Sequence, residues 1–320
     1  MDLVQLHRLM LVARRVDEEA IALQRQGVLP GYAPMKGQEA AQVGSAAALD
    51  PARDFAFPTY RELGAAVALG VDLPGYLATH LGVWHGGMYD PLASRFAPFN
   101  AVVGGPVTHA VGWAMGARLD GTAGAAITYF GDGASSQGDV HEAMNFAAVY
   151  RLPVIFFCQN NGWAISVPAE RQVAGGSVAA RAQGYGIEGL RVDGNDVLAV
   201  HEATLAALER GRAGEGPTVI EAMTYRMGPH STSDDPGRYR TLAEEQAWAR
   251  RDPLARAAAQ LPESVVTEAE EHAAKVTGQV RKALTEMGDR PGEELFDFVY
   301  REPTKALLEQ RREWKEWSDA

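Results

Sequence analysis

Apolar residues recur every three to four positions at the start of the chain, which is the period of an amphipathic helix. Gly27 follows the last of them, and glycine commonly ends a helix. We therefore expect a helix over about 2–26, within an N-terminal helical segment of residues 1–30. The apolar positions that support it are Leu3, Leu6, Leu9, Met10, Ala13, Val16, Ala20 and Leu23.

The middle of the chain alternates short apolar runs with helical patterns. The run 125–130 leads into a glycine-rich loop, a helical pattern covers about 137–150, and a second run follows at 154–158. This order is typical of a parallel crossover unit. The alternation predicts an α/β fold with a doubly wound, mainly parallel sheet flanked by helices, and with ligands at the carboxyl ends of its strands. Two further strands and the helix between them are predicted at 187–192, 218–225 and 196–212.

Helical patterns flank this region on both sides. Residues 228–240 are different, because they are rich in Gly, Pro, Ser and Asp and hold almost no large apolar residue. We expect them to form an exposed loop that becomes ordered when a ligand binds. Residues 31–240 are therefore assigned to one ligand-binding domain and residues 241–320 to a helical C-terminal extension. The flanking helices are predicted at 38–49, from Tyr60 onwards, and at 106–119, 242–251, 265–287 and 303–317.

The composition narrows the classes of function. Hydrophobic residues make up 46% and charged residues 22% of the 320 residues, which predicts one large globular core and little disorder. The net charge of −11 argues against nucleic acid or an anionic membrane surface as a partner, since both usually require a basic surface. An anionic ligand would therefore need a local site.

Cysteine usage and the N-terminus bear on localisation. Cys158 is the only cysteine, so no intrachain disulfide is possible, and a reducing compartment is expected. Charged residues interrupt the first twenty positions, which argues against a signal peptide, and no apolar stretch approaches the ~20 residues of a membrane span. We expect a soluble, cytoplasmic protein.

Polar residues follow two of the predicted neighbouring strands. Asp132 comes directly after the strand 125–130, and Asn161 lies 29 positions later, just after the strand 154–158. Because parallel strands end at one edge of the sheet, both side chains should meet there. Mg²⁺ prefers oxygen ligands and takes one or two from protein side chains, with phosphate oxygens completing its shell. Ser136 and Asp139 also fit a capping box, which would place a helix N-terminus beside an anion.

The run from Gly131-Asp132-Gly133 to Asn160-Asn161 resembles the thiamine-diphosphate motif of transketolases, pyruvate decarboxylases and 2-oxoacid dehydrogenases. The resemblance implies that the Asp132 carboxylate, the Asn161 amide and the backbone carbonyl of Trp163 bind Mg²⁺. It also implies that Gly133 and Ala134 contact the cofactor, since glycine lets the backbone approach the diphosphate closely.

A wider resemblance, from about residue 36 to 240, is to the alpha subunits of heterotetrameric 2-oxoacid dehydrogenases. Phe57-Pro-Thr-Tyr60-Arg61-Glu62 is similar to the block whose Tyr and Arg contact the diphosphate, so Tyr60 and Arg61 are candidates. The string from Tyr225 to Asp235 is similar to the family's active-site loop, which makes His230 the candidate catalytic and cofactor-binding residue. Mammalian relatives are phosphorylated at the serine that matches Ser231.

Ala101 and Val103 match positions that support the thiazolium ring in pyruvate-type relatives, although core packing would explain them equally well. The loop string resembles branched-chain enzymes more than pyruvate enzymes. This sequence nevertheless lacks the Ser, Thr and Gln set that holds a potassium ion in mammalian branched-chain enzymes. A dinucleotide-like pattern, Gly184-Tyr-Gly186-Ile-Glu-Gly189, precedes a predicted strand rather than following one, so we interpret it as a turn.

The resemblance implies oxidative decarboxylation of a 2-oxoacid, with acyl transfer to the lipoyl group of an acyltransferase core. The alpha chain would hold Mg²⁺ and the diphosphate of thiamine diphosphate, and a beta subunit would complete the site in an α2β2 heterotetramer. Branched-chain 2-oxoacids are the favoured substrates, with pyruvate and acetoin as alternatives. A noncatalytic thiamine-diphosphate-binding subunit and a split transketolase are further alternatives, both disfavoured by the loop around His230.

Overall fold

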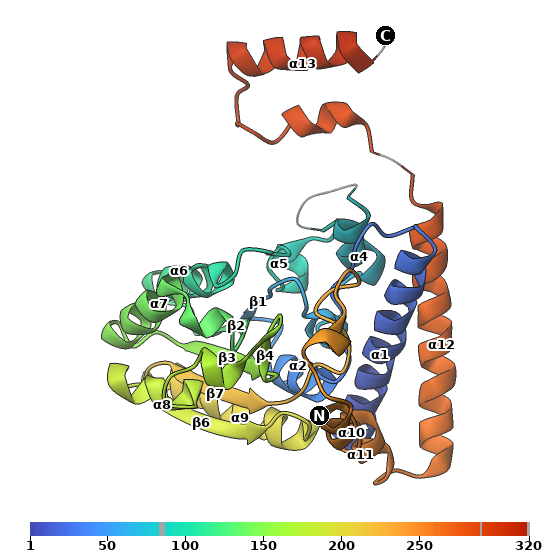
Figure 1. Cartoon of the computed structure of the whole chain (residues 1–320). Helices are drawn as coiled ribbons and strands as arrows, with labels where there is room; N and C mark the ends of the chain where they lie inside the picture. Colours follow the sequence, from blue (N-terminus) through green and yellow to red (C-terminus); the bar gives the residue numbers. More distant parts are fainter. Residues whose placement is uncertain (83–86, 289, 319–320) are drawn as a thin grey trace. The chain divides into compact units, whose positions relative to one another are not determined.

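The computed structural model describes residues 1–82, 87–288 and 290–318. They form two compact units, Met1–Thr285 and Glu286–Ala320, and the larger unit holds the sheet. Figure 1 shows the course of the chain. The division into residues 1–30, 31–240 and 241–320 that the sequence suggests remains a prediction.

A five-stranded sheet, parallel throughout, forms the centre of the larger unit. Its order is β1-β2-β3-β7-β6, so the predicted α/β class with a parallel sheet is confirmed. Four of the strands lie where the apolar runs predict them. The fifth, β1, was missed, because three residues are too few to establish a periodic pattern. The strands are β1 (Phe55–Phe57), β2 (Ala126–Gly131), β3 (Val154–Asn160), β6 (Glu188–Asp193) and β7 (Thr218–Met223).

Helices cover the two faces of this sheet (Figure 1). On one face α6 (Gly105–Leu119) packs against β1, β2 and β3, with α7 (Gly138–Val149) beside it. On the other face α9 (Val197–Arg212) packs against β3, β6 and β7, and α2 (Glu39–Ala46) packs on α9. Burial of apolar area on both faces stabilises the domain, which explains why β3 is buried along its whole length.

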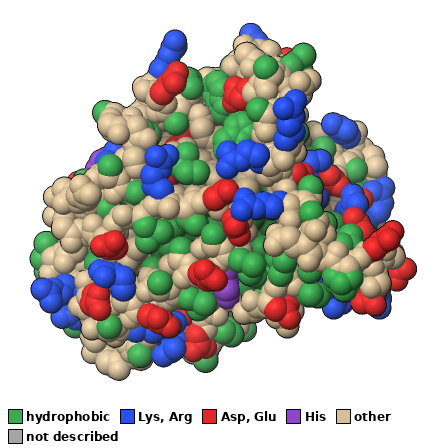
Figure 2. Space-filling view, turned by 90° about the horizontal axis from the view of Figure 1, so that it is seen from below, with side chains coloured by type: hydrophobic (Ala, Val, Ile, Leu, Met, Phe, Trp, Pro, Cys, Tyr) green, Lys and Arg blue, Asp and Glu red, His purple; other side chains and the backbone are tan. Residues whose placement is uncertain are grey.

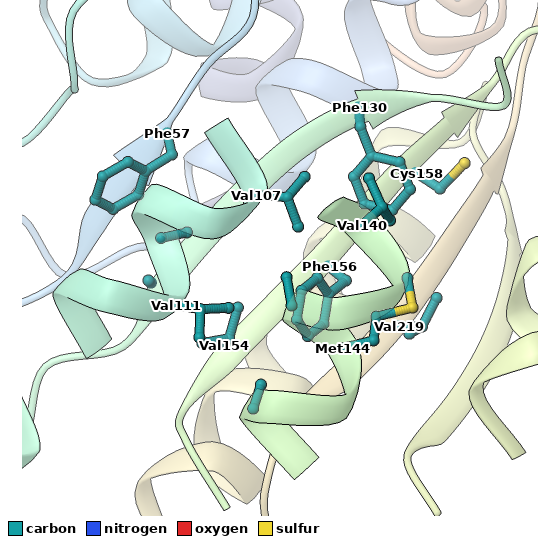
Figure 3. Close-up of a cluster of buried hydrophobic side chains, with 14 of the residues drawn as sticks. Phe57, Val107, Val111, Phe130, Val140, Met144, Val154, Phe156, Cys158 and Val219 are labelled. Carbon is teal, nitrogen blue, oxygen red and sulfur yellow. The ribbon is translucent and has the colours of Figure 1, made fainter. Parts of the chain in front are cut away.

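The core between the sheet and the pair α6 and α7 is made of aliphatic and aromatic side chains (Figure 3). Phe130 and Phe156 extend from β2 and β3 toward Val107 on α6 and Met144 on α7. Cys158 belongs to the same cluster and is fully buried, which suits a small apolar residue. The apolar side chains of the strands therefore bury this face of the sheet beneath α6 and α7.

Two predictions about helix starts are wrong. Ser136 and Asp139 do not form a capping box: α7 begins at Gly138 after a 3₁₀ turn, Ala134–Ser136, and the Ser136 hydroxyl donates to the carbonyl of Gln172. The helix predicted from Tyr60 onwards begins only at Leu63, because the Glu62 carboxylate turns back to accept from the backbone N–H and the hydroxyl of Thr59.

The pattern from Gly184 to Gly189 forms a 3₁₀ turn followed by β6, as predicted. The N-terminal helix is also confirmed, as α1, whose Asp2 and Gln5 make a capping box. α12 runs beside α1 (Figure 1), and the two are joined by the ion pairs Arg15–Glu270 and Arg281–Glu19. The remaining helices of this unit are α1 (Leu3–Arg25), α3 (Leu63–Ala68), α4 (Leu73–Leu81), α5 (Pro91–Ser94), α8 (Val178–Ala182), α10 (Leu242–Ala249), α11 (Pro253–Ala258) and α12 (Glu263–Glu286), and β4 (Trp163–Ala164) and β5 (Val167–Pro168) form a small hairpin.

The smaller unit consists of a 3₁₀ turn, Gly292–Phe296, and α13 (Lys305–Ser318). The Phe296 ring lies 6.1 Å from the ring of Trp314, and the Arg311 guanidinium pairs with Asp297. Throughout the described part of the chain, no helix is long and apolar enough to cross a membrane. Figure 2 shows acidic and basic side chains interspersed on the face seen there, so an anionic ligand would depend on a local group of cations.

Candidate cofactor site

A cavity of about 510 Å³ opens at the carboxyl ends of β2 and β3. All of the site residues predicted from the sequence line it, although they come from segments up to 170 positions apart. The structure therefore brings them together in space. They are Tyr60, Arg61, Ala101, Val103, Asp132, Gly133, Ala134, Asn161, Trp163 and His230.

Asp132 follows the last residue of β2 and is 1% exposed. Neither of its carboxylate oxygens makes a hydrogen bond of normal geometry within the described residues. Burial raises the pKa of Asp132 to about 6, although the nearby backbone N–H groups of Asp132 and Asn161 and the charge of Arg226 oppose this shift. A buried carboxylate without a partner is unfavourable, so this position suits a cation ligand.

Asn160 and Asn161 end the neighbouring strand and face different partners. The Asn160 amide donates to Glu221 at 2.7 Å, on the side of the sheet toward β7. The Asn161 amide instead donates to Gln38 Oε1 at 2.7 Å, and its Oδ1 accepts from the N–H of Trp163 at 3.2 Å. Only Asn161 of the two lines the cavity with Asp132.

The donor set at this point fits Mg²⁺. Within the described residues, no group of three or more His, Cys, Asp and Glu side chains could hold a metal ion. A cation beside Asp132 would therefore depend on one carboxylate, amide or carbonyl oxygens, and oxygens of its own ligand. That combination is typical of Mg²⁺ bound together with phosphate groups. The carboxylate of Asp132 lacks the partner that such a cation would supply.

Arg61 and His230 form a pair that also lines the cavity. Arg61 Nη1 donates to the carbonyl of Pro34 at 2.6 Å, while Nη2 donates to the carbonyl of His230 at 2.9 Å and lies 3.2 Å from its Nδ1. A guanidinium can only donate, so Nδ1 must be the unprotonated nitrogen and Nε2 must carry the proton. The Tyr60 ring lies edge-on to His230 at 6.1 Å.

The His230 imidazole is neutral at physiological pH. Burial, together with the charges of Arg61 and Arg226, lowers the pKa of His230 to about 4, while the charge of Asp234 opposes this shift. A neutral imidazole with its proton on Nε2 can donate one hydrogen bond to an anion without adding a charge. That property suits a group that would contact an anionic ligand beside Arg61 and Arg226.

Arg226 was not identified as a site residue, although it lies within the string from Tyr225 to Asp235. It is 1% exposed and lines the cavity. Its Nη2 donates to the carbonyl of Ile165 at 3.1 Å, whereas Nε and Nη1 have no partner in the described residues. Burial, with the charges of Arg61 and Arg240, lowers the pKa of Arg226 to about 10. A buried guanidinium with free donors is a strong anion site.

Small and apolar residues form the rest of the wall. A Cβ at Gly133 would lie 2.7 Å from the Cβ of Ala164, so only glycine allows the loop this close to the β4–β5 hairpin. Val103 is 47% exposed and Ile165 is 54% exposed at the rim. Ile165 has a φ of +56°, a strained conformation for a β-branched residue and one found at functional sites. Side chains at the rim therefore present an apolar surface that the described chain leaves uncovered.

A parallel α/β sheet whose strand ends gather a buried carboxylate and a buried guanidinium, both with polar atoms that have no partner in the described residues, is the arrangement expected of proteins that bind an anionic ligand together with a hard cation. The comparisons with known proteins specify this class. Residues 7–294 match the family described as "Dehydrogenase E1 component", and the chain belongs to this family. It is therefore a component of an oxidoreductase of a thiamine-diphosphate-dependent family.

Three relatives illustrate the similarity. The 3-methyl-2-oxobutanoate dehydrogenase subunit alpha of Mycobacterium tuberculosis is 45% identical over 96% of this chain and 85% of its own length. The pyruvate dehydrogenase E1 component subunit alpha of Staphylococcus epidermidis is 40% identical over 98% of this chain and 86% of its own. The 2-oxoisovalerate dehydrogenase subunit alpha of Bacillus subtilis is 43% identical over 78% of this chain and 79% of its own.

Proposed function

We propose that this chain is the alpha subunit of a 2-oxoacid dehydrogenase that decarboxylates branched-chain 2-oxoacids and transfers the acyl group to a lipoyl group. The observation that carries the proposal is the cavity in which the unpartnered Asp132 carboxylate and the free Nη1 of Arg226 stand together. A metal ion and a diphosphate would satisfy these two groups at once. The 45% identity to a 3-methyl-2-oxobutanoate enzyme subunit supports the substrate class.

Each side of the cavity has a distinct role in this proposal. Asp132, Asn161 and the carbonyl of Trp163 hold Mg²⁺. The diphosphate oxygens accept from Tyr60, Arg61, Arg226 and His230, with Gly133 and Ala134 allowing close approach of the backbone. Ala101 and Val103 support the thiazolium ring.

Bound thiamine diphosphate supplies the carbanion chemistry, and the chain supplies position and charge. The guanidinium groups of Arg61 and Arg226 neutralise the diphosphate in a buried setting, where ionic hydrogen bonds are strong. The His230 Nε2–H donates to a diphosphate oxygen or to charge that develops beside it. Because Nδ1 faces the Arg61 guanidinium and Nε2 already carries the proton, the neutral His230 serves as a hydrogen-bond donor in this arrangement and not as a base.

We further propose that the site is completed by a beta subunit in an α2β2 heterotetramer that docks on a lipoyl-bearing acyltransferase core in the cytoplasm. The names of the relatives, which are alpha subunits, support this. The exposed rim residues Val103 and Ile165 also support it, since a partner would bury them.

Pyruvate is the second candidate substrate, favoured by the 40% identity to a pyruvate dehydrogenase subunit, and acetoin is a third.

A mixing assay tests the function. The chain, its beta partner, Mg²⁺ and thiamine diphosphate should decarboxylate 3-methyl-2-oxobutanoate with a higher kcat/KM than pyruvate. The chain alone should show no turnover. A preference for pyruvate would overturn the substrate assignment, and full turnover without beta subunit would overturn the shared site.

A further inference from the structure

Two chain segments that are distant in sequence lie against each other beside the cavity. Residues 32–37 follow α1, and residues 224–232 follow β7 and include His230. The pairing spans the length of the first segment. Its hydrogen bonds run from the Met227 N–H to the Lys36 carbonyl (2.8 Å), from the Thr232 N–H to the Tyr32 carbonyl (2.8 Å), from the Tyr32 N–H to the Thr232 hydroxyl (3.1 Å) and from the Thr224 hydroxyl to the Gly37 carbonyl (3.0 Å).

One carboxylate on α1 holds the first of these segments. Asp17 is fully buried, and its Oδ1 accepts from the Tyr32 hydroxyl at 2.7 Å and from the Met35 N–H at 2.8 Å. Its Oδ2 accepts from the Lys36 N–H at 3.2 Å. A single side chain therefore receives three donors from five consecutive positions, which fixes the backbone conformation between them.

Asp17 differs from an ordinary structural ion pair. Within the described residues, no salt bridge involves Asp17, and the like charge of Glu39 further disfavours its ionised form. Glu39 in turn accepts from the Gly37 N–H and pairs with Arg14. Burial raises the pKa of Asp17 to about 6 despite its three donors. The segment 32–37 thus supplies the polar groups that stabilise this carboxylate.

The segment 32–37 contacts Arg61 directly and pairs with the backbone next to His230. The carbonyl of Pro34 accepts from Arg61 Nη1, and Pro34 lies between the residues that Asp17 binds. Thr232, which pairs with Tyr32, is two residues after His230. A shift of this segment would therefore move the acceptor that orients Arg61 and the backbone that carries His230 together.

We propose that Asp17 is a positioning residue of the cofactor site, which holds residues 32–37 so that Arg61 and His230 face the diphosphate. The inference rests on the proposed function for the identity of the ligand. The mechanical link, by which Asp17 holds Arg61 and His230 through residues 32–37, rests only on contacts within this chain. Within the described residues, the hydrogen-bond partners of Asp17 are Tyr32, Met35 and Lys36, none of which lines the cavity, so it acts through the segment.

The substitution Asp17→Asn tests this link in the full chain. It keeps the shape of the side chain but replaces an acceptor with an amide that faces donors. Glu18→Gln is the matched control, because Glu18 is the next residue on α1 and binds the segment only through the ammonium of Lys36. Hydrogen exchange without cofactor should be about tenfold faster at the Thr232 and Met227 amides in D17N, as loss of a charged acceptor implies, and unchanged in E18Q.

Amides of β7 report whether any change is local. Equal protection at Thr232 and Met227 in D17N and the wild type would overturn the proposal, and so would an equal loss of protection throughout β7. If D17N does not fold, Tyr32→Phe removes one donor to Asp17 and should give a smaller, equally local change.

A second measurement connects the link to the ligand. The assembled enzyme with D17N should need about tenfold more thiamine diphosphate for half-maximal activity, with kcat at saturating cofactor nearly unchanged. If kcat falls and the cofactor requirement does not change, the positioning role is wrong. If the wild type does not bind thiamine diphosphate but the exchange result holds, the proposed function fails and the mechanical link stands.

Discussion

At the residue scale, the site combines groups that are unfavourable in the chain by itself. The Asp132 carboxylate and the Arg226 guanidinium are both 1% exposed, and both have polar atoms without partners in the described residues. Groups of this kind reduce the free energy of unfolding unless a ligand satisfies them. Asp132 and Arg226 are therefore better explained by ligand binding than by a contribution to the stability of the fold.

Replacing Asp132 with Asn should separate its effect on cofactor binding from its effect on the free energy of unfolding. We expect Asp132→Asn to weaken Mg²⁺-dependent binding of thiamine diphosphate about a hundredfold, because a neutral amide is a poor ligand for Mg²⁺. The cofactor-free variant should be as stable as the wild type or more stable at pH 7.5. Calorimetric titration would measure the affinity for thiamine diphosphate, and urea unfolding would measure the free energy of unfolding. Undiminished affinity would remove Asp132 from the metal site.

The stability difference should also depend on pH. The pKa of Asp132 in the folded chain is about 6, above its usual value, so the folded state binds the proton more tightly than the unfolded state. The unfavourable effect of the charge is therefore complete above pH 6 and disappears as the pH falls toward 4. The free energy of unfolding of Asp132→Asn should exceed that of the wild type by less at pH 5 than at pH 7.5. An advantage that widens on acidification would contradict the assignment.

The sequence predicted the site residues that belong to contiguous motifs. Asp132, Asn161 and His230 could be named because each lies in a short, recognisable string. Gln38 and Arg226 were missed, although Arg226 lies in the string from Tyr225 to Asp235, since their roles arise from contacts across the fold. Gln38 meets Asn161 from 123 positions away, and Arg226 differs from a surface arginine only in its burial. No local pattern contains that information.

At the element scale, the long periodic segments were predictable and the short irregular ones were not. β2, β3 and α9 follow strong apolar patterns, whereas β1 has three residues and the turn Ala134–Ser136 replaces the predicted capping box. The loop at 228–240 was expected to lack anchors. It in fact has polar ones, because Thr232 pairs with Tyr32 and the Arg240 guanidinium donates to the carbonyls of Arg226 and Gly228. Its mobility remains a prediction.

Gly37 is required for the pairing of residues 32–37 with residues 224–232. Gly37 has a φ of +98°, and a Cβ there would lie 2.2 Å from the carbonyl oxygen of Tyr225. Gly37→Ala should therefore destabilise the chain by roughly 2 kcal/mol or more. It should also weaken cofactor binding, because the pairing leads to His230.

Gly27→Ala is the control for this substitution. Gly27 also has a positive φ, +80°, but nothing lies within 4 Å of a Cβ built there. Its replacement should destabilise the chain by only about 1 kcal/mol, from backbone strain, and leave cofactor affinity unchanged. Urea unfolding and titration of both variants would decide. Equal effects of the two substitutions would show that the close contact at Gly37 is unimportant.

At the scale of the whole molecule, every residue that lines the cavity belongs to the unit Met1–Thr285. A chain that ends at Gly288 should therefore fold and bind Mg²⁺ and thiamine diphosphate with the affinity of the full chain. The smaller unit exposes Leu295 and Tyr300, which suits a contact with another chain rather than with the cofactor. A truncated chain with lost cofactor affinity would contradict this division.

The unpartnered charges of the cavity also connect cofactor supply with the lifetime of the chain in a cell. A ligand that binds only the folded state raises stability with its concentration, and proteases degrade chains in proportion to the fraction that unfolds. Asp132 and Arg226 increase that dependence, because their strain is relieved only by the ligand. If the proposed cofactor is bound here, we expect empty subunits to be degraded first when thiamine is scarce, so that the abundance of the enzyme follows the vitamin without a dedicated regulator.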